Sequence, residues 1–268
     1  MIYLIATPIG NLADISLRAL DVLKEVDLIA CEDTRTSKIL LDHYNIKKKL
    51  VSYHKFNEAQ RAAELIEFAK AGQNIGVISD AGMPGISDPG NYLIREAIEK
   101  GVDYTLIPGA SAFSAALVLS GFENSRFTFY GFFPGKTRER KALFEEIKRN
   151  KHTMIFYEAP HKLDKTMEDL LDIIPDRRMA IVREISKLYE DVKIFTVRNY
   201  FQTDIVKKGE MVLLIDADES EEELSDEFIT AELEKFTASG MTKKMAVKEV
   251  CKLYKLPKNQ VYELSLGI

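Results

Sequence analysis

Glycine, proline, serine and aspartate gather in five short segments of this 268-residue chain. The richest segment, SDAGMPGISDPG at residues 79–90, holds two prolines, two aspartates and four glycines or alanines. Small residues allow close approach of the backbone to a ligand, prolines fix the shape of a loop, and carboxylates can act as bases. The other four segments are ATPIGN (6–11), CEDTR (31–35), SYHKFN (52–57) and PGASAF (108–113). These residue types predict a ligand site that carries acid–base groups.

Alternating strands and helices are predicted to bring the five segments together. Apolar runs predict strands at 2–7, 27–32, 49–53, 74–80 and 103–109, and helical patterns at 16–26, 35–44, 58–72, 89–101 and 110–121. This alternation indicates a parallel sheet with crossover helices. Because ligands bind beyond the carboxyl ends of parallel strands, the five segments should meet at one rim.

The known phosphate-binding loops do not account for this rim. The chain has no G-x-x-x-x-G-K-[ST] loop and no G-x-G-x-x-G loop after its first strand. Glu32 lies where a ribose-binding acid would follow a Rossmann glycine loop, which keeps a dinucleotide site as an alternative. Pro8, however, lacks the N–H group that a pyrophosphate would need. Prolines and small residues better suit an uncharged or cationic ligand.

The second half of the chain predicts a different architecture. Strands are expected at 126–134, 153–159, 178–184, 191–198 and 209–217, with helices at 136–150 and 161–174 and a helix-like segment at 184–191. This order indicates a second α/β domain with a mixed sheet. Residues 216–234 then hold ten acidic residues and no basic one, whereas residues 238–258 hold six lysines and one glutamate. We expect an acidic linker and a small helical module, with helices near 228–238, 242–253 and 257–266, compatible with a helix-turn-helix.

Several segments together resemble a known protein family. They are ATPIGNLADISLRAL, LIACEDTRTS, ISDAGMPGISDPG, LIPGASAFSAAL, FYGFFP, FYEAPHKL, REISKLYED and GEMVLLI, in this order. The chain resembles the tetrapyrrole methylase superfamily over essentially its whole length, and most closely its ribosomal RNA small subunit methyltransferase I branch. EDTR and SDAG-x-P-x-ISDPG mark this branch, whereas the tetrapyrrole branch has a GDP loop at the same place.

The resemblance implies two α/β domains with a cofactor cleft between them, plus the C-terminal helical module. We place the domains at residues 1–120, 121–218 and 228–268. Such proteins bind S-adenosylmethionine and usually work as homodimers. The implied reaction is methylation of the ribose 2′-hydroxyl of a decoding-centre cytidine, nucleotide 1402 of 16S ribosomal RNA in the 30S subunit. The implied cofactor-binding residues are Pro8, Ser79, Asp80, Ala81, Ile86, Ser111, Ala112, Tyr157, Glu158, Ile185 and Met211.

A ribose hydroxyl is a weak acid, so its methylation should need a positioned base. The catalytic candidates at the rim are Glu32, Asp33, Arg35 and Asp88, with Arg35 holding a phosphate or orienting an acid. His54, after the third predicted strand, could also serve as the base, and the residues do not decide among His54 and the carboxylates. Structural roles are the alternatives. Asp33 would cap a helix, Arg35 would pair with an acid on the surface, and Asp88 would start a turn before the next helix.

Basic residues indicate where RNA would bind. Lysines on short helices usually form a solvated face, but an RNA substrate favours phosphate contacts. The expected contacts are Lys136, Arg138 and Arg140 after FFPG, and Lys243, Lys244, Lys248 and Lys252 in the C-terminal module. The aromatic run FTFYGFF is read as strand core rather than as a base-stacking surface.

Composition bounds the remaining function classes. Apolar residues make up 46% of the chain, charged residues 29%, and the net charge is -5, all ordinary values for a globular protein. Two distant cysteines and four scattered histidines predict neither a disulfide framework nor a metal site. No membrane span or signal peptide is expected, and a reducing cytoplasm is the simplest location.

Three other functions remain open at this point. A methyltransferase acting on a tetrapyrrole-like small molecule is the main alternative, and EDTR, the SDAG loop and the basic tail disfavour it. A nucleic-acid-binding protein without catalysis would leave the rim segments unexplained. A nicotinamide dehydrogenase is disfavoured by the missing glycine fingerprint.

Overall fold

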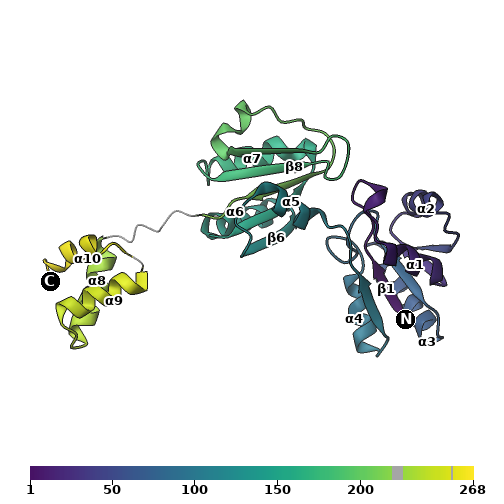
Figure 1. The fold of residues 1–268 in the computed structure, drawn as a ribbon, viewed down its shortest axis with the longest axis horizontal. Helices are drawn as coiled ribbons and strands as arrows, with labels where there is room; N and C mark the ends of the chain where they lie inside the picture. The colour runs from purple at the N-terminus through teal and green to yellow at the C-terminus, as the bar shows by residue number, and fades with distance from the viewer. Residues whose placement is uncertain (219–225, 255) are drawn as a thin grey trace. The chain divides into compact units, whose positions relative to one another are not determined.

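The computed structural model describes residues 1–218, 226–254 and 256–268. The chain divides into two compact units, residues 1–218 and residues 219–268. The first unit is built on two five-stranded sheets, and three helices form the described part of the second (Figure 1). Within the described ranges, no helix has the length and apolar character needed to cross a bilayer.

The first sheet is parallel throughout, in the order β3-β2-β4-β1-β5. Its strands are β1 (Ile2–Ile5), β2 (Leu28–Cys31), β3 (Lys49–Ser52), β4 (Ile75–Ile78) and β5 (Tyr104–Ile107). Helices α1 (Leu17–Glu25), α2 (Thr34–His43), α3 (Glu58–Lys70) and α4 (Asn91–Glu99) connect these strands, and a 3-10 turn η1 (Leu12–Asp14) precedes α1. The predicted parallel sheet is therefore confirmed.

Apolar cores fill both faces of this sheet. Because successive strand residues point to opposite faces, Leu28 and Ala30 join the core formed with α3 and α4. Ile29 and Cys31 join the core formed with α1 and α2. The sheet is thus held rigidly from both sides, and its carboxyl-end loops project from a fixed frame.

The second sheet is mixed, as predicted, in the order β6-β7-β10-β8-β9. Strands β6 (Phe127–Phe132) and β7 (Thr153–Glu158) are parallel, whereas β8 (Arg178–Arg183), β9 (Asp191–Thr196) and β10 (Met211–Ile215) pair antiparallel. Helices α6 (Thr137–Arg149) and α7 (Leu163–Leu171) and the 3-10 segment η3 (Val197–Gln202) contribute to the core on one face. A 3-10 turn η2 (Pro160–Lys162) leads into α7.

Helix α5 (Ala112–Ser120) covers the other face of the second sheet. Ala116 and Leu117 pack there against strand residues such as Val182 and Leu214. We had placed this helix within the first domain, residues 1–120, because it follows β5 directly. Sequence order does not reveal which of two sheets a helix will cover. The apolar core of the second sheet therefore begins earlier in the chain than the predicted boundary at residue 121.

Residues 184–190 form turns before β9, not the helix-like element that we expected at 184–191. Glu184 and Ser186 have φ angles of 52° and 67°, in the left-handed region. The backbone N–H of Lys187 donates to the carbonyl of Glu184, which closes a tight turn at 3.0 Å. A right-handed helix cannot pass through two such residues.

The second unit contains helices α8 (Asp226–Ala238), α9 (Lys243–Tyr254) and α10 (Lys258–Ser265), close to the predicted ranges. Ile229, Leu233, Val247, Val250 and Val261 form a small apolar core between them. This core fixes the exposed faces of the three helices with respect to one another.

Candidate active site

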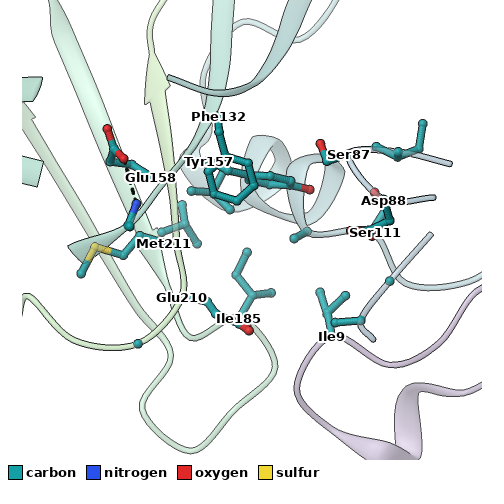
Figure 2. Close-up of a pocket in the computed structure, with 18 of the residues that line it drawn as sticks. Ile9, Ser87, Asp88, Ser111, Phe132, Tyr157, Glu158, Ile185, Glu210 and Met211 are labelled. Carbon is teal, nitrogen blue, oxygen red and sulfur yellow. Dashed lines mark hydrogen bonds between the residues drawn. The ribbon is translucent and has the colours of Figure 1, made fainter. Parts of the chain in front are cut away.

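A cavity of 390 Å³ lies between the rim of the first sheet and the strands of the second sheet (Figure 2). Cavities of about 300–1,000 Å³ are typical of small-molecule and cofactor sites. Its acidic lining residues are Asp88, Glu158 and Glu210, and the other described residues of the lining include no Lys, Arg or His. Such a lining suits a ligand with positive charge, in agreement with the ligand type expected from the sequence.

The loop at residues 79–90 forms much of the first-sheet wall. An isolated bridge joins Thr7 to Gly82. Gly82 has a φ of 81°, and a Cβ there would lie 3.2 Å from a side-chain carbon of Ile9. The hydroxyl of Ser79 lies 3.3 Å from the carbonyl of Gly82 and can donate to it. This backbone geometry is what the glycines of the SDAG segment permit.

The second-sheet wall comes from neighbouring strands and the turns beside them. The antiparallel register places Met211 opposite Glu158 and Val212 opposite Tyr157. On its other side Val212 lies opposite Val182 of β8, so β10 separates Val182 from Tyr157 of β7. Pairing therefore brings residues from distant parts of the sequence onto one wall.

Eight of the eleven predicted cofactor residues line the cavity: Ala81, Ile86, Ser111, Ala112, Tyr157, Glu158, Ile185 and Met211. Pro8, Ser79 and Asp80 do not belong to the lining. Pro8 and Ser79 are buried behind it, and Ser79 shapes the loop through its hydroxyl. Asp80 accepts a hydrogen bond from the backbone N–H of Asp33 at 3.1 Å. Ser79 and Asp80 thus stabilise the loops of the rim through hydrogen bonds instead.

Sequence reasoning missed Phe132 as a lining residue. We read the run FTFYGFF as strand core, but Phe132 is 61% exposed and its ring meets that of Tyr157 at 5.4 Å. A register shift between Phe129 and Gly131, where Gly131 has a φ of 70°, interrupts the regular strand alternation. The glycine in the middle of an aromatic strand was the available signal.

Asp88 is the one of the four catalytic candidates that lines the cavity. Its pKa is raised to about 7, first by burial and then by the negative charges of Glu32 and Asp80. Burial, followed by the charge of Asp80, also raises the pKa of Glu32. Gly90, not Asp88, occupies the N-cap of α4, and no side chain caps that helix. Asp88 is therefore a half-buried carboxyl in the cavity wall that can exchange a proton near neutral pH.

Asp33 and Arg35 occupy the structural places that we had kept as alternatives. The Asp33 carboxylate caps α2 by accepting from the backbone N–H of Arg35 at 2.8 Å. It also pairs with the Arg35 guanidinium at 2.7 Å, and these bonds lower the pKa of Asp33 to about 2. The Arg35 side chain is 90% exposed. Neither residue lines the cavity.

The predicted RNA contacts fall into two groups. Lys244, Lys248 and Lys252 are exposed along α9, and Lys243 donates to the carbonyl of Ile268 at 2.6 Å. Arg138 is exposed, and Lys136 pairs with Glu139 at 3.1 Å. Arg140 differs from all of these, because its side chain is 18% exposed and its Nε donates to Asp169 at 2.7 Å.

Known proteins that are similar to this chain belong to the family that the sequence segments resemble. The model of the tetrapyrrole (corrin/porphyrin) methylases matches residues 1–200. Ribosomal RNA small subunit methyltransferase I of Synechocystis is 41% identical over 100% of this chain and 98% of the relative. The protein of the same description from Halalkalibacterium halodurans is 40% identical over 98% and 93%. The Bacillus subtilis relative is 39% identical over 98% and 93%.

Solved structures share the fold at low sequence identity. Diphthine synthase superposes with a TM-score of 0.66 at 17% identity, covering 80% of this chain and 89% of that one. Uroporphyrin-III-C-methyltransferase from Thermus thermophilus superposes with a TM-score of 0.57 at 18% identity, covering 80% and 93%. These likenesses support the two-sheet architecture alone.

Proposed function

This chain belongs to the tetrapyrrole (corrin/porphyrin) methylase family and to its ribosomal RNA small subunit methyltransferase I branch, and we propose that it methylates ribosomal RNA with S-adenosylmethionine as the donor. The observation that carries the proposal is the acidic, mostly apolar cavity with Asp88 in its wall. The names of relatives that align over nearly the whole chain support RNA as the substrate class.

The finer proposal is methylation of a ribose 2′-hydroxyl, that of the cytidine at nucleotide 1402 of 16S ribosomal RNA in the 30S subunit. It rests on the EDTR and SDAG segments, which resemble those of this branch. A ribose hydroxyl loses a proton as it is methylated, and the carboxylate of Asp88 is suited to accept it. We also propose that the protein works as a homodimer in the cytoplasm.

The residues of the cavity fit S-adenosylmethionine. A volume of 390 Å³ is of the right order for a nucleoside joined to an amino acid, and an acidic lining without basic side chains among its described members favours a cation. Ala81 and Ile86 on one wall and Tyr157, Ile185 and Met211 on the other would hold it. When bound, its sulfonium supplies an activated methyl group that a nucleophile can displace.

The chain's own residues would then position the RNA oxygen and remove its proton. Holding two reactants in line can supply much of the rate, on the order of 7–11 kcal/mol in favourable cases. Asp88, with a pKa of about 7, is a stronger base than an ordinary aspartate and is still ionised in part at neutral pH. A base of this kind typically contributes about 10²–10⁴-fold.

Exposed lysines provide the expected contacts with the RNA backbone. Lys244, Lys248 and Lys252 recur every fourth residue along α9 and share one face. Neutralising phosphates by lysine gives binding that weakens with salt. In this proposal Arg138 and Lys136, both exposed, form a second contact region on the first unit.

The test is transfer of radiolabelled methyl groups from S-adenosylmethionine to 30S subunits from cells that lack this protein. The expected product, identified by mass spectrometry, is one 2′-O-methylcytidine in 16S ribosomal RNA. S-adenosylmethionine binding without transfer to 30S subunits would instead favour a tetrapyrrole-like small-molecule substrate. Absence of cofactor binding would contradict the proposal as a whole.

A further inference from the structure

A chain of buried hydrogen bonds runs from the cavity into the core of the second sheet. Glu158 lines the cavity but is only 4% exposed, and Thr166 of α7 is fully buried. The Thr166 hydroxyl lies 2.6 Å from Oε2 of Glu158. Nη2 of Arg140 in turn lies 2.9 Å from the Thr166 hydroxyl oxygen. Arg140 thus reaches the cavity wall through one intermediate side chain.

Hydrogen-bond chemistry fixes the direction of this chain. A guanidinium can only donate, so the Thr166 oxygen accepts from Arg140, and the Thr166 hydroxyl donates its single hydrogen to Oε2 of Glu158. Oε1 of Glu158 accepts from the backbone N–H of Ala159 at 2.9 Å, shown dashed in Figure 2. Both carboxyl oxygens therefore act as acceptors, which is the pattern of an ionised carboxylate.

Several contacts hold the Arg140 side chain in place. Its Nε donates to Asp169 at 2.7 Å, and its guanidinium lies over the rings of Phe133 and Phe144 at 5.5 and 5.0 Å. Asp169 also pairs with Lys165 at 2.9 Å. Burial acts to raise the pKa of Asp169, but the bonds from Lys165 and Arg140 outweigh it and lower the pKa. Arg140, which we predicted to contact RNA phosphate, is thus part of an ion-pair network with Asp169 and Lys165.

The Glu158 carboxylate keeps capacity for further donors. A carboxylate has about four acceptor positions, and Thr166 and Ala159 use two. The nearest positive charge to Glu158 in this network belongs to Arg140, and the Thr166 hydroxyl lies between the two. A buried carboxylate gains most from a charge-assisted hydrogen bond, so a ligand with an N–H group facing Glu158 would be bound selectively.

We propose that Arg140 and Thr166 are positioning residues, which hold Glu158 as an ionised acceptor for an N–H group of the cofactor. The proposal rests on the proposed function, because it takes S-adenosylmethionine as the ligand. That molecule offers two such groups, the exocyclic amine of adenine and the ammonium of the amino acid. Both are nitrogen donors, and probes that lack one or the other distinguish them.

The experiment measures binding by calorimetry, independently of methyl transfer. The probes are S-adenosylhomocysteine, which has both nitrogens, 5′-methylthioadenosine, which lacks the amino acid, and S-inosylhomocysteine, which lacks the exocyclic amine. The test variant is Thr166→Val, which keeps the side-chain shape and removes the hydroxyl. Thr166→Ser, which keeps the hydroxyl, is the matched control.

Thr166→Val should bind S-adenosylhomocysteine about tenfold or more weakly, whereas Thr166→Ser should stay within about threefold of the unaltered protein. If the adenine amine is the donor, S-inosylhomocysteine should not discriminate between the two variants. If the ammonium is the donor, 5′-methylthioadenosine should not discriminate between them. Either result supports the proposal and identifies the group.

A double-mutant cycle separates positioning from a general structural effect. Glu158→Gln should itself weaken binding, and adding Thr166→Val to it should cost little more, because Thr166 acts through Glu158. Glu158→Gln also provides the test if Thr166→Val does not fold. Equal affinities for Thr166→Val and Thr166→Ser, or full additivity with Glu158→Gln, would overturn the proposal. No binding of S-adenosylhomocysteine to the unaltered protein would overturn the proposed function as well.

Discussion

The two walls of the cavity are built in different ways. The first-sheet wall consists of loops that follow strands, and its chemistry-bearing member, Asp88, is half buried with acidic neighbours. The second-sheet wall consists largely of strand residues such as Tyr157 and Met211, which are also part of the apolar cores on the two faces of that sheet. Asp88 and Ile86 of the first wall can therefore be changed without opening a core, whereas Met211 of the second wall cannot.

This difference assigns distinct tasks to the two walls. A loop supported by a parallel sheet can place a reactive group while its neighbours set the pKa of that group. A strand wall instead provides shape and excludes water, and its substitution should affect binding and stability together. The following predictions test this division, beginning with the largest effect.

Asp88→Asn should lower the rate of methyl transfer by about 10²–10⁴-fold, because asparagine cannot accept the proton. Affinity for S-adenosylmethionine should change little. Single-turnover transfer and calorimetry with the same preparation check both statements. An unchanged rate would exclude Asp88 as the base. Asp33→Asn is the control, because it keeps a residue that can cap α2 outside the cavity, and it should retain methyl transfer.

The same substitution makes a prediction about stability. The folded pKa of Asp88 is about 7 and its ordinary value is 3.8, so ionisation of Asp88 opposes folding as pH rises through this interval. Asp88→Asn should therefore stabilise the protein above about pH 7 and have little effect below about pH 4. Urea unfolding at several pH values measures this change, and an equal effect at all pH values would contradict it.

Met211→Ala should destabilise the protein by about 2–5 kcal/mol, because Met211 is 4% exposed and packs in the core of the second sheet. It should weaken cofactor binding as well. Ile86→Ala on the opposite wall, where the side chain is 38% exposed, should affect stability much less. Equal losses of stability in the two variants, measured by urea unfolding, would break the comparison between the walls.

The three aligned lysines of α9 should influence RNA binding alone. Replacing Lys244, Lys248 and Lys252 by glutamine should make the slope of log affinity against log salt shallower by about 2, at about 0.7 for each contact. Cofactor affinity should stay as it was. Filter binding of RNA over a range of salt concentrations gives the slope. An unaltered slope would mean that these lysines face solvent and do not contact RNA phosphates.

Glu32→Gln gives the smallest expected effect. Removing the charge of Glu32 should lower the pKa of Asp88, since that charge is one of the causes that raise it. A base acts when deprotonated, so the rise of the transfer rate with pH, near pH 7 in the unaltered protein, should move to lower pH. The rate at about pH 6 should increase a few-fold relative to its plateau. A pH profile that keeps its midpoint would exclude this coupling.

The position of the first-sheet rim could be predicted from the residues alone, although three of the residues expected there (Pro8, Ser79 and Asp80) do not line the cavity. Strand ends followed by Gly, Pro, Ser and Asp indicate a rim without any knowledge of tertiary contacts, and the parallel sheet confirms where they meet. The residues did not show that Arg140 turns inward, because exposed and internal arginines look alike in an amphipathic helix. They also did not show that Phe132 leaves the core, since this follows from an irregularity in strand pairing.

The packing of α5 on the second sheet also bears on how the two halves can be recombined. Strand β5 ends at Ile107 in the first sheet, and α5 begins at Ala112 against the second, so residues 108–111 are the covalent crossing between two complete cores. Ser111 and Ala112 line the cavity at this crossing. Chimaeras of related chains joined within 108–111 would inherit each core intact, with the ligand spanning the joint.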